Sequence, residues 1–256
     1  MSAAGQSGFR LEDLPNGYRV GRHAALERIP GAVHVVTTRH GPNFWPVKQG
    51  DDAPLRMIAE VLGVEGVAYA RHVHGADILP ADRPGYVGEA DGLVTRRRSL
   101  AIAAFGADCV DILAVDPVGR SLGAVHAGWR GTVARAARNL IRAMAEHCGS
   151  APADVIACLG PSIGPCCFFM GQDALDAARR TYGAIADSFF APSGEWLAFD
   201  LWAANVADLV SAGLKRENVH PCGICTSCRT DEFFSYQKER LDANSCSAVA
   251  LVPEEG

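Results

Sequence analysis

The sequence predicts an α/β fold in a single domain, and two hydrophobic patterns support this. Residues 99–105 are apolar almost without interruption, which is typical of a strand covered on both faces. From Thr132 the apolar side chains instead recur at helical spacing until Gly149. The chain has 256 residues, of which 48% are hydrophobic and 21% are charged, so it is long enough for one large domain.

Strand and helix patterns alternate along the rest of the chain. Residues 1–16 are polar and glycine-rich, and we expect them to form a flexible segment, with residues 17–256 as the single domain and ordered strand structure from about Tyr18. Further strands are expected at 33–38, 67–73, 110–115, 121–125, 154–159, 218–222 and 246–252, and further helices at 54–63, 172–182 and 200–213.

Composition indicates which partners the protein can have. The chain carries 24 basic and 29 acidic side chains, a net charge of −5, so no basic field attracts nucleic acid or an anionic membrane. No apolar run approaches the roughly 20 residues of a membrane-spanning helix, and residues 1–6 lack the pattern of a secretory signal. We therefore expect a cytoplasmic monomer or small homo-oligomer that binds small molecules. Its nine cysteines should then be free thiols or metal ligands.

The stretch from Gly123 to Thr132 marks a change from a strand to a helix. It places His126 at the end of the strand, and Thr132 is suited to begin the helix. Arginine side chains and the backbone amides at a helix start both favour anions. Arg130 and Gly131 are therefore candidates for an anion-binding role.

His74, Cys109 and His126 form the predicted metal site. A strand period of two would place His72 and His74 on the same side, and Cys109 and His126 are expected at neighbouring strand ends. Two imidazoles and one thiolate suit a borderline-soft divalent ion, and three protein ligands leave a tetrahedral zinc ion one position for water or substrate. Because structural sites normally use four protein ligands, the count favours a catalytic zinc ion.

Two other chemistries use the same residues. Cys109 and His126 could act as nucleophile and base without a metal, as in cysteine hydrolases. Two histidines and a cysteine also bind copper, usually with an axial methionine, for which Met170 is the free candidate. A trinuclear copper cluster would use most of the eight histidines, and the chain has one His-x-His pair, so zinc is expected over copper.

A second cysteine pattern lies near the C-terminus. Cys222, Cys225 and Cys228 form two successive C-x-x-C spacings, which suggest an iron–sulfur or zinc site. A fourth ligand at good spacing is missing, because Cys246 lies eighteen residues further on and no Cys-Pro follows. The sequence leaves the role of this pattern open.

Five motifs together resemble the laccase-domain family, also known as the YfiH-like polyphenol oxidase or peptidoglycan editing factor family. The resemblance covers about residues 30–252, and the motifs within 107–132 and 160–168 are specific in combination. The motifs are His-Val-His-Gly-Ala-Asp at 72–77, Ala-Asp-Cys-Val-Asp-Ile-Leu at 107–113, Val-His-Ala-Gly-Trp-Arg-Gly-Thr at 125–132, Gly-Pro-Ser-Ile-Gly-Pro-Cys-Cys-Phe at 160–168 and Phe-Phe-Ser-Tyr at 233–236.

This resemblance implies a single-domain α/β/β/α sandwich with mixed sheets. It also implies that His74, Cys109 and His126 match the family's zinc ligands. Better-understood members are purine nucleoside phosphorylases with adenosine deaminase and methylthioadenosine phosphorylase activity, whereas the older family name claims copper-dependent oxidation of phenols. The expected partners are therefore a purine nucleoside and phosphate.

Loops on the substrate side depart from the family pattern. The expected Arg-x-Gly-Gly reads Arg39-His40-Gly41-Pro42, and Gln237 replaces the arginine that usually follows Phe-Phe-Ser-Tyr. The closing Thr-Gly-Arg reads Ala243-Asn244-Ser245. The metal ligands are intact, so the metal chemistry is better supported than the substrate.

These observations define a predicted mechanism and its alternatives. The metal either polarises water for deamination or orients phosphate for attack at the ribose carbon of a purine nucleoside. Asp108 is a candidate to transfer a proton or orient an imidazole, while Arg39 and Arg130 are candidates for the phosphate or ribose side. Three alternatives remain: a metal- or Cys/His-dependent hydrolase of peptidoglycan precursors, a copper-dependent phenol oxidase, and a non-catalytic metal-binding module.

Overall fold

Two mixed β-sheets form the centre of the molecule. The computed structural model describes residues 8–253, so residues 1–7 of the predicted flexible segment lie outside the described residues. The first sheet contains, in spatial order, β1 (Phe9–Asp13), β2 (Arg19–His23), β3 (Ala32–Thr37), β16 (Ser245–Leu251), β8 (Leu100–Gly106), β4 (Gly66–Arg71) and β6 (Gly85–Glu89).

The second sheet faces the first, and a small third sheet lies beside them. In spatial order the second sheet contains β15 (Val219–Pro221), β11 (Ile156–Leu159), β9 (Val110–Asp116), β10 (Ser121–Ala127), β7 (Gly92–Thr95) and β5 (Ile78–Pro80). The third sheet contains β12 (Phe169–Met170), β14 (Trp196–Phe199) and β13 (Phe190–Ser193).

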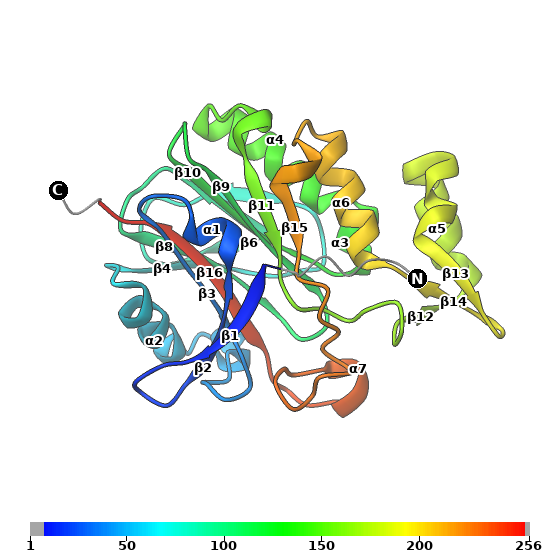
Figure 1. Cartoon of the computed structure of the whole chain (residues 1–256), viewed down its shortest axis with the longest axis horizontal. Coiled ribbons are helices and arrows are strands. Elements are labelled where there is room, and N and C mark those ends of the chain that lie inside the picture. The colour runs from blue at the N-terminus through cyan, green and yellow to red at the C-terminus, as the bar shows by residue number, and fades with distance from the viewer. Residues whose placement is uncertain (1–7, 254–256) are drawn as a thin grey trace.

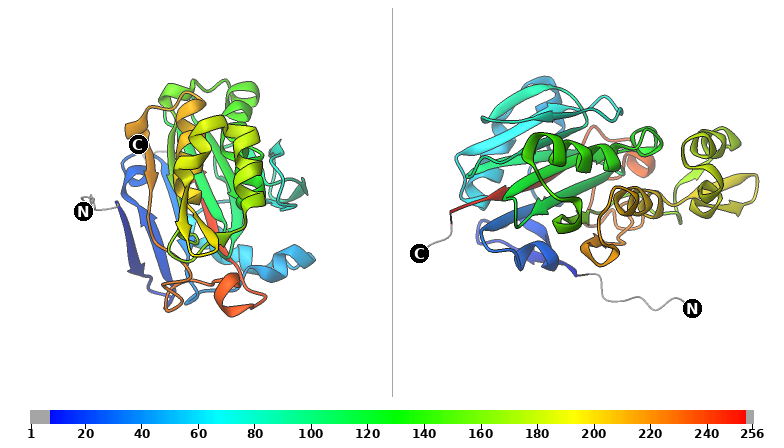
Figure 2. Two further views of the ribbon diagram at one scale, coloured as in Figure 1. Left: turned by 90° about the vertical axis from the view of Figure 1, so that its right-hand side faces the viewer. Right: turned by 90° about the horizontal axis from the view of Figure 1, so that it is seen from above.

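Helices cover the outer faces of the two large sheets (Figures 1 and 2). The α-helices are α1 (Ala24–Glu27), α2 (Ala53–Leu62), α3 (Trp129–Val133), α4 (Ala136–Cys148), α5 (Gln172–Tyr182), α6 (Leu201–Ser211) and α7 (Tyr236–Glu239). Short 3-10 helices span Trp45–Gln49, Pro152–Asp154, Gly183–Phe189 and Arg216–Asn218.

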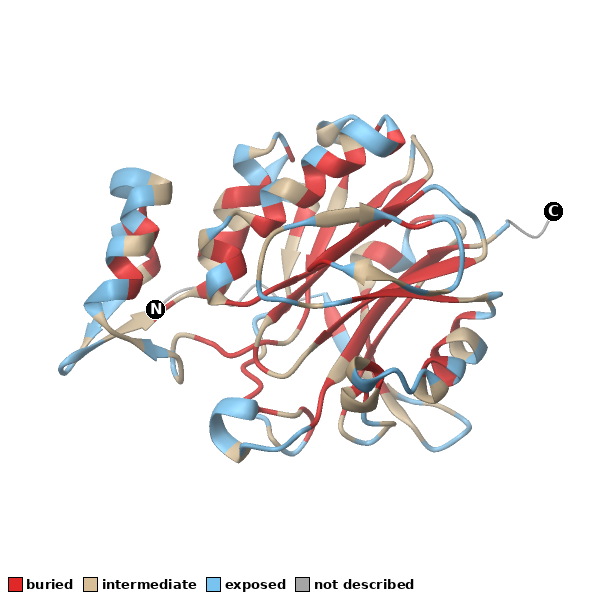
Figure 3. Ribbon diagram, turned by 180° about the vertical axis from the view of Figure 1, so that it is seen from behind, coloured by how far each residue is buried: buried red, intermediate tan, exposed pale blue. Residues whose placement is uncertain are grey.

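Strand alternation divides the core into layers. Leu113 of β9 and Val249 of β16 belong to a buried cluster between the two sheets. The opposite face of the first sheet packs against α2, and the opposite face of the second packs against α4 and α6. Buried residues accordingly run along the central strands in Figure 3. The predicted α/β/β/α sandwich with mixed sheets is confirmed.

The chain forms a strand earlier than the sequence predicts. We expected ordered strand structure from about Tyr18, but β1 already pairs antiparallel with β2 along its whole length. Phe9 provides the physical reason, because its side chain packs in a buried cluster with Val36 and Phe233. Burying one aromatic ring at this sheet edge offsets the cost of ordering a short polar strand.

The predicted helix from Thr132 is in fact two helices. The first, α3, begins at Trp129 after the N-cap Gly128, and Arg135 interrupts the helix with a left-handed φ of 65°. Arg135 donates to the Asp208 carboxylate of α6 at 2.8 Å, which compensates for this strained backbone. Among the described residues, none of the helices is long and apolar enough to cross a membrane.

Candidate metal centre

Cys109 and His126 lie side by side because β9 and β10 are antiparallel neighbours. Their pairing places His126 opposite Asp111 and Ala127 opposite Val110. The residue that precedes β9 therefore lies beside the end of β10, as the sequence predicts. Alternation along β10 also directs His126 toward the space between the sheets.

His74 reaches the same place from the loop after β4. Its backbone lies in the left-handed region, with a φ of 59°. The backbone N–H groups of His74 and Gly75 donate to the Asp91 carboxylate at 2.9 and 2.6 Å, which holds this conformation. Since β4 ends at Arg71, the predicted strand to Val73 is too long.

The donor atoms of His74, Cys109 and His126 converge. Those that could bind a metal ion all lie within 4.8 Å of one another. His126 donates its Nδ1–H to the Asp91 carboxylate at 3.1 Å, which leaves Nε2 for the ion. A carboxylate behind a ligating histidine is the usual support of a zinc site. Two imidazoles, one thiolate and this support fit a zinc ion with an open fourth position.

His72 packs behind the metal group and does not belong to it. Its ring stacks on that of His126, with 4.5 Å between the centroids, and its Nδ1 lies 3.2 Å from the Phe105 carbonyl oxygen. Burial and the charge of His126 lower the pKa of His72 well below its usual value. A neutral His72 therefore fixes the plane of the His126 ring. The predicted His72–His74 pair contributes one ligand.

Cys109 and His126 stabilise each other's charged forms before any metal binds. Burial opposes ionisation of the Cys109 thiol, but the charge and hydrogen bonds of His126 and His74 outweigh it and lower the pKa to about 6. Burial likewise opposes protonation of His126, but the Cys109 thiolate and the Asp91 carboxylate raise its pKa to about 10. The metal-free protein therefore holds a thiolate–imidazolium pair near neutral pH.

Gly128 allows the cysteine and histidine to approach the start of α3. A Cβ atom at this position would lie 2.8 Å from Cys109 Sγ and 3.4 Å from His74 Cδ2. Both atoms belong to the metal group, so a side chain at residue 128 would displace it. This close approach explains the first glycine of the His-Ala-Gly-Trp-Arg-Gly motif.

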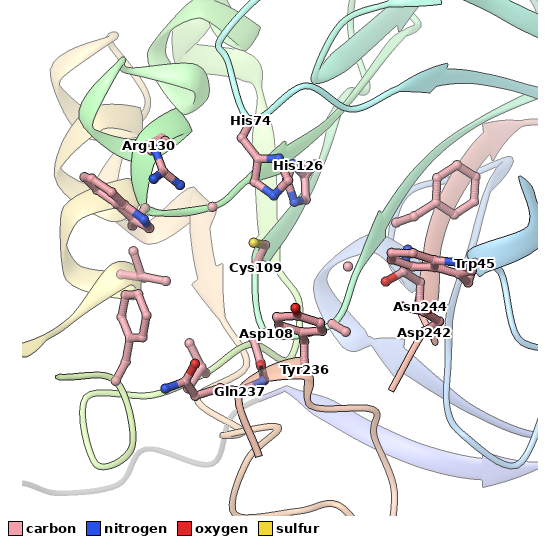
Figure 4. Close-up of a pocket in the computed structure, with 18 of the residues that line it drawn as sticks. Trp45, His74, Asp108, Cys109, His126, Arg130, Tyr236, Gln237, Asp242 and Asn244 are labelled. Atoms are coloured by element: carbon pink, nitrogen blue, oxygen red, sulfur yellow. Dashed lines mark hydrogen bonds between the residues drawn. The ribbon is translucent and has the colours of Figure 1, made fainter. Parts of the chain in front are cut away.

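The metal group lies in the wall of a cavity of about 580 Å³. This volume is in the usual range for small-molecule sites. Figure 4 shows the group between Arg130 on one side and Trp45, Asp242 and Asn244 on the other. The other apolar and aromatic lining residues include Phe105, Trp129, Ile163, Phe168, Phe169, Met170, Leu201 and Tyr236.

Arg130 reaches the cavity, whereas Gly131 does not line it. The Arg130 guanidinium lies 4.6 Å from the centre of the Trp129 ring, and among the described residues no carboxylate forms an ion pair with it. Gly131 is buried in α3, where a Cβ atom would lie 2.8 Å from the Gly75 carbonyl oxygen. The predicted substrate-binding role of Gly131 is therefore replaced by a packing role.

Arg39 lies outside the cavity. Its guanidinium forms an ion pair with Glu239 at 3.0 Å and donates to the Thr230 carbonyl oxygen. It also lies 5.4 Å from the centre of the Phe234 ring. These contacts fasten β3 to the segment that leads into α7. We expected Arg39 on the phosphate or ribose side of the site, but the structure does not bring it to the cavity.

Asp108 contacts the segment after β15. Thr226 Oγ1 and the Gln237 backbone N–H each donate to one of its carboxylate oxygens at 2.6 Å. The carboxylate that orients an imidazole is Asp91, so our prediction of that role for Asp108 is wrong. Asp108 still lines the cavity, where proton transfer remains a prediction.

Sequence reasoning missed Asp91 and Lys48. Asp91 is fully buried between β6 and β7, and the signal was one acidic residue in the apolar stretch Ala90-Asp91-Gly92-Leu93. Lys48 lines the cavity, and its ammonium lies 4.6 Å from the centre of the Trp45 ring. Burial lowers the pKa of Lys48. No local pattern distinguishes this lysine from a surface lysine.

Comparison with known proteins places this geometry in context. Residues 48–251 match the family model described as "Multi-copper polyphenol oxidoreductase laccase". The solved structure of YlmD from Geobacillus stearothermophilus superposes with a TM-score of 0.86 at 27% identity, covering 96% of this chain and all of that one.

Curated relatives carry enzyme names. The purine nucleoside phosphorylase YlmD of Geobacillus stearothermophilus is 32% identical over 236 residues, covering 82% of this chain and 86% of YlmD. The human purine nucleoside phosphorylase LACC1 is 35% identical over 156 residues, which cover 59% of this chain and 36% of LACC1. The adenosine deaminase RL5 of an unknown prokaryote is 36% identical over 156 residues, covering 60% of this chain and 58% of RL5.

The first prediction concerns the carboxylate behind the metal group. Replacing it, Asp91→Asn, removes the charge that supports His126 and is expected to weaken zinc binding about 10- to 100-fold. Affinity is measured by competition with a chromophoric chelator. Asp116→Asn is the control, because Asp116 is also buried but accepts hydrogen bonds in the turn after β9. Equal zinc affinities of the two variants would contradict the assigned role.

The second prediction concerns the pH dependence of zinc affinity. Since the pKa of His126 is raised to about 10 and that of Cys109 is lowered to about 6, only His126 must lose its proton to bind zinc near neutral pH. The apparent affinity should therefore rise about tenfold per pH unit between about pH 7 and pH 9. Calorimetry in buffers of different ionisation enthalpy measures the proton released. An affinity independent of pH in this range would show that His126 is already neutral.

Proposed function

The chain belongs to the multi-copper polyphenol oxidoreductase laccase family, and we propose that within it this protein is a zinc-dependent purine nucleoside phosphorylase. The observation that carries the proposal is the group of His74, Cys109 and His126 in the wall of a cavity that Arg130 also lines, a cation with no ion-pair partner between residues 8 and 253. The names of YlmD and LACC1 supply the substrate class. Methylthioadenosine phosphorolysis and adenosine deamination are proposed as further activities of the same site.

The lining of the cavity suits the parts of a nucleoside. Tyr236 and Phe168 offer faces on which a purine ring can stack. Asn244 and Gln237 offer amide groups that can donate hydrogen bonds to ring nitrogens. Arg130 offers a fork of donors that matches two phosphate oxygens. A nucleoside and a phosphate ion can therefore meet in front of the metal group.

The chain's own residues would position the reactants. In phosphorolysis a phosphate oxygen bonds to the ribose C1′ while the bond from C1′ to the purine nitrogen breaks, and the purine leaves with the electron pair. Arg130 would hold the phosphate, and Asn244 or Gln237 would donate a hydrogen bond to the departing purine. Asp91 would keep His126 in the orientation that binds zinc. When bound, zinc would supply a Lewis acid that polarises an oxygen atom in the cavity.

Deamination is the second candidate, and a relative named adenosine deaminase supports it. The residues that would hold zinc for phosphorolysis would also serve deamination, in which a water oxygen bonds to the purine carbon that carries the amino group and that group leaves as ammonia. This reaction needs no phosphate. Its product is inosine rather than a free base, so the two activities can be separated in one assay.

The third prediction tests the reaction itself. Zinc-loaded protein is expected to release adenine or hypoxanthine from adenosine or inosine, with phosphate raising the yield, and Cys109→Ala is expected to abolish release because the zinc loses its thiolate ligand. Chromatography of bases and ribose 1-phosphate provides the measurement. Cys148→Ala is the control, because this thiol lies at the end of α4 away from the cavity. Failure of zinc-loaded protein to release a base from any nucleoside would overturn the phosphorylase proposal. Oxidation of a phenol by copper-loaded protein would favour the phenol oxidase alternative.

The fourth prediction tests the phosphate side of the cavity. Loss of a charged hydrogen-bond donor, in Arg130→Gln, is expected to raise the KM for phosphate about 10- to 100-fold. Arg39→Gln is the matched control, since Arg39 pairs with Glu239 outside the cavity. It should leave the KM for phosphate unchanged. A larger effect of Arg39→Gln than of Arg130→Gln would reverse these assignments.

A further inference from the structure

Four cysteines from two distant segments meet outside the metal centre described above. Cys166 and Cys167 follow β11, and Cys225 and Cys228 follow β15. Their sulfur atoms all lie within 4.8 Å of one another. Cys228 Sγ lies 3.6 Å from Cys166 Sγ and 3.5 Å from Cys167 Sγ.

The fold brings the two segments together without help from the thiols. Strands β11 and β15 are parallel neighbours, so the segments that follow them leave the sheet at the same end. Beyond the strands, Ser162 pairs with Cys225 in an isolated β-bridge. The Ser162 N–H donates to the Ile224 carbonyl oxygen at 3.2 Å, and the Thr226 N–H donates to the Ser162 carbonyl oxygen at 3.0 Å. The backbone therefore preforms the cysteine cluster.

The other cysteines of the sequence pattern lie elsewhere. Cys222 is buried against Phe9 and Phe233, and Cys246 is buried in β16. The C-terminal pattern therefore contributes two cysteines to the cluster, Cys225 and Cys228, and the earlier Gly-Pro-Cys-Cys motif contributes the other two. Sequence spacing could not indicate this, because about sixty residues separate the two pairs.

Backbone donors in the cluster favour a thiolate. The Gly164 N–H donates to Cys225 Sγ at 3.2 Å. Burial opposes ionisation of Cys225, but this bond and one from the Cys228 N–H outweigh it and lower its pKa. Burial and the neighbouring thiols raise the pKa of Cys166. Four neighbouring thiolates would repel one another. A bound cation would offset this repulsion and stabilise all four sulfur atoms as thiolates.

We propose that Cys166, Cys167, Cys225 and Cys228 bind a second metal ion, a zinc ion in a closed site of four thiolates. Four sulfur atoms about 2.3 Å from one ion are about 3.8 Å apart, which is close to the two measured separations. Four protein ligands also mark a structural site, in contrast to the three ligands of the first centre. Cys166 and Cys228 are exposed, so an ion can enter from solvent.

The second ion would fasten two walls of the cavity to each other. The segment after Cys167 supplies Phe168, Phe169 and Met170 to the lining. The segment after Cys228 leads to Tyr236 and Gln237, which also line the cavity (Figure 4). Losing the ion should loosen both segments while the His74–Cys109–His126 group stays intact.

Metal analysis of the whole protein tests the proposal. Protein purified under reducing conditions and equilibrated with zinc should contain two ions per chain by mass spectrometry of the metals. Cys109→Ala should contain one, and the double variant Cys225→Ser/Cys228→Ser should also contain one. Cys148→Ala is the matched control and should keep two. One ion in the reduced native protein, with none in Cys109→Ala, overturns the proposal.

Two further measurements guard against a variant that misfolds. Cobalt added to Cys109→Ala should give the intense charge-transfer absorption of a four-thiolate site, and its absence overturns the proposal. Chelation of that ion should increase amide exchange in residues 160–170 and 222–240. An intact mass two daltons low in the reduced, zinc-treated protein would assign the cluster to a disulfide instead. These readouts do not depend on nucleoside phosphorolysis, so the two proposals can fail separately.

Discussion

The buried Asp91 carboxylate is the interaction on which the metal centre depends. It accepts hydrogen bonds from the backbone of His74 and Gly75 and from the imidazole of His126. Two residues of the metal group, one in the loop after β4 and one in β10, are thus fixed by one charged group. Because Asp91 is fully buried, removing it would leave those donors without a partner in a low-dielectric environment.

The packing of two sheets explains why this centre lies where it does. Strand alternation that directs Leu113 and Val249 into the core also directs Asp111 and Ser247 toward each other at the end of the same layer, where Ser247 donates to Asp111 at 3.0 Å. Burial raises the pKa of Asp111 to about 7. The apolar layer therefore ends in a polar group beside His126, and the cavity opens beyond it.

Much of the fold and the three residues of the candidate metal group could be predicted from the sequence, because local patterns encode them. Apolar runs mark the strands, helical spacing marks α4 and α5, and His126 follows a strand pattern closely. Arg39 shows the limit of this reasoning. An arginine at a strand end resembles an anion-binding residue until the position of its partner, Glu239, is known.

The sequence by itself determined the α/β class and the grouping of His74, Cys109 and His126, since residue types and spacing carry that information, and the layered sandwich followed from the family resemblance. Only the tertiary structure decided that Asp91 supports the centre, that Arg130 and not Arg39 reaches the cavity, and that Cys166 and Cys167 lie against Cys225 and Cys228. The physical reason is that these pairings join segments far apart in the chain. The order of the strands in each sheet and the course of the loops determine which of these residues meet, and no local sequence pattern specifies either.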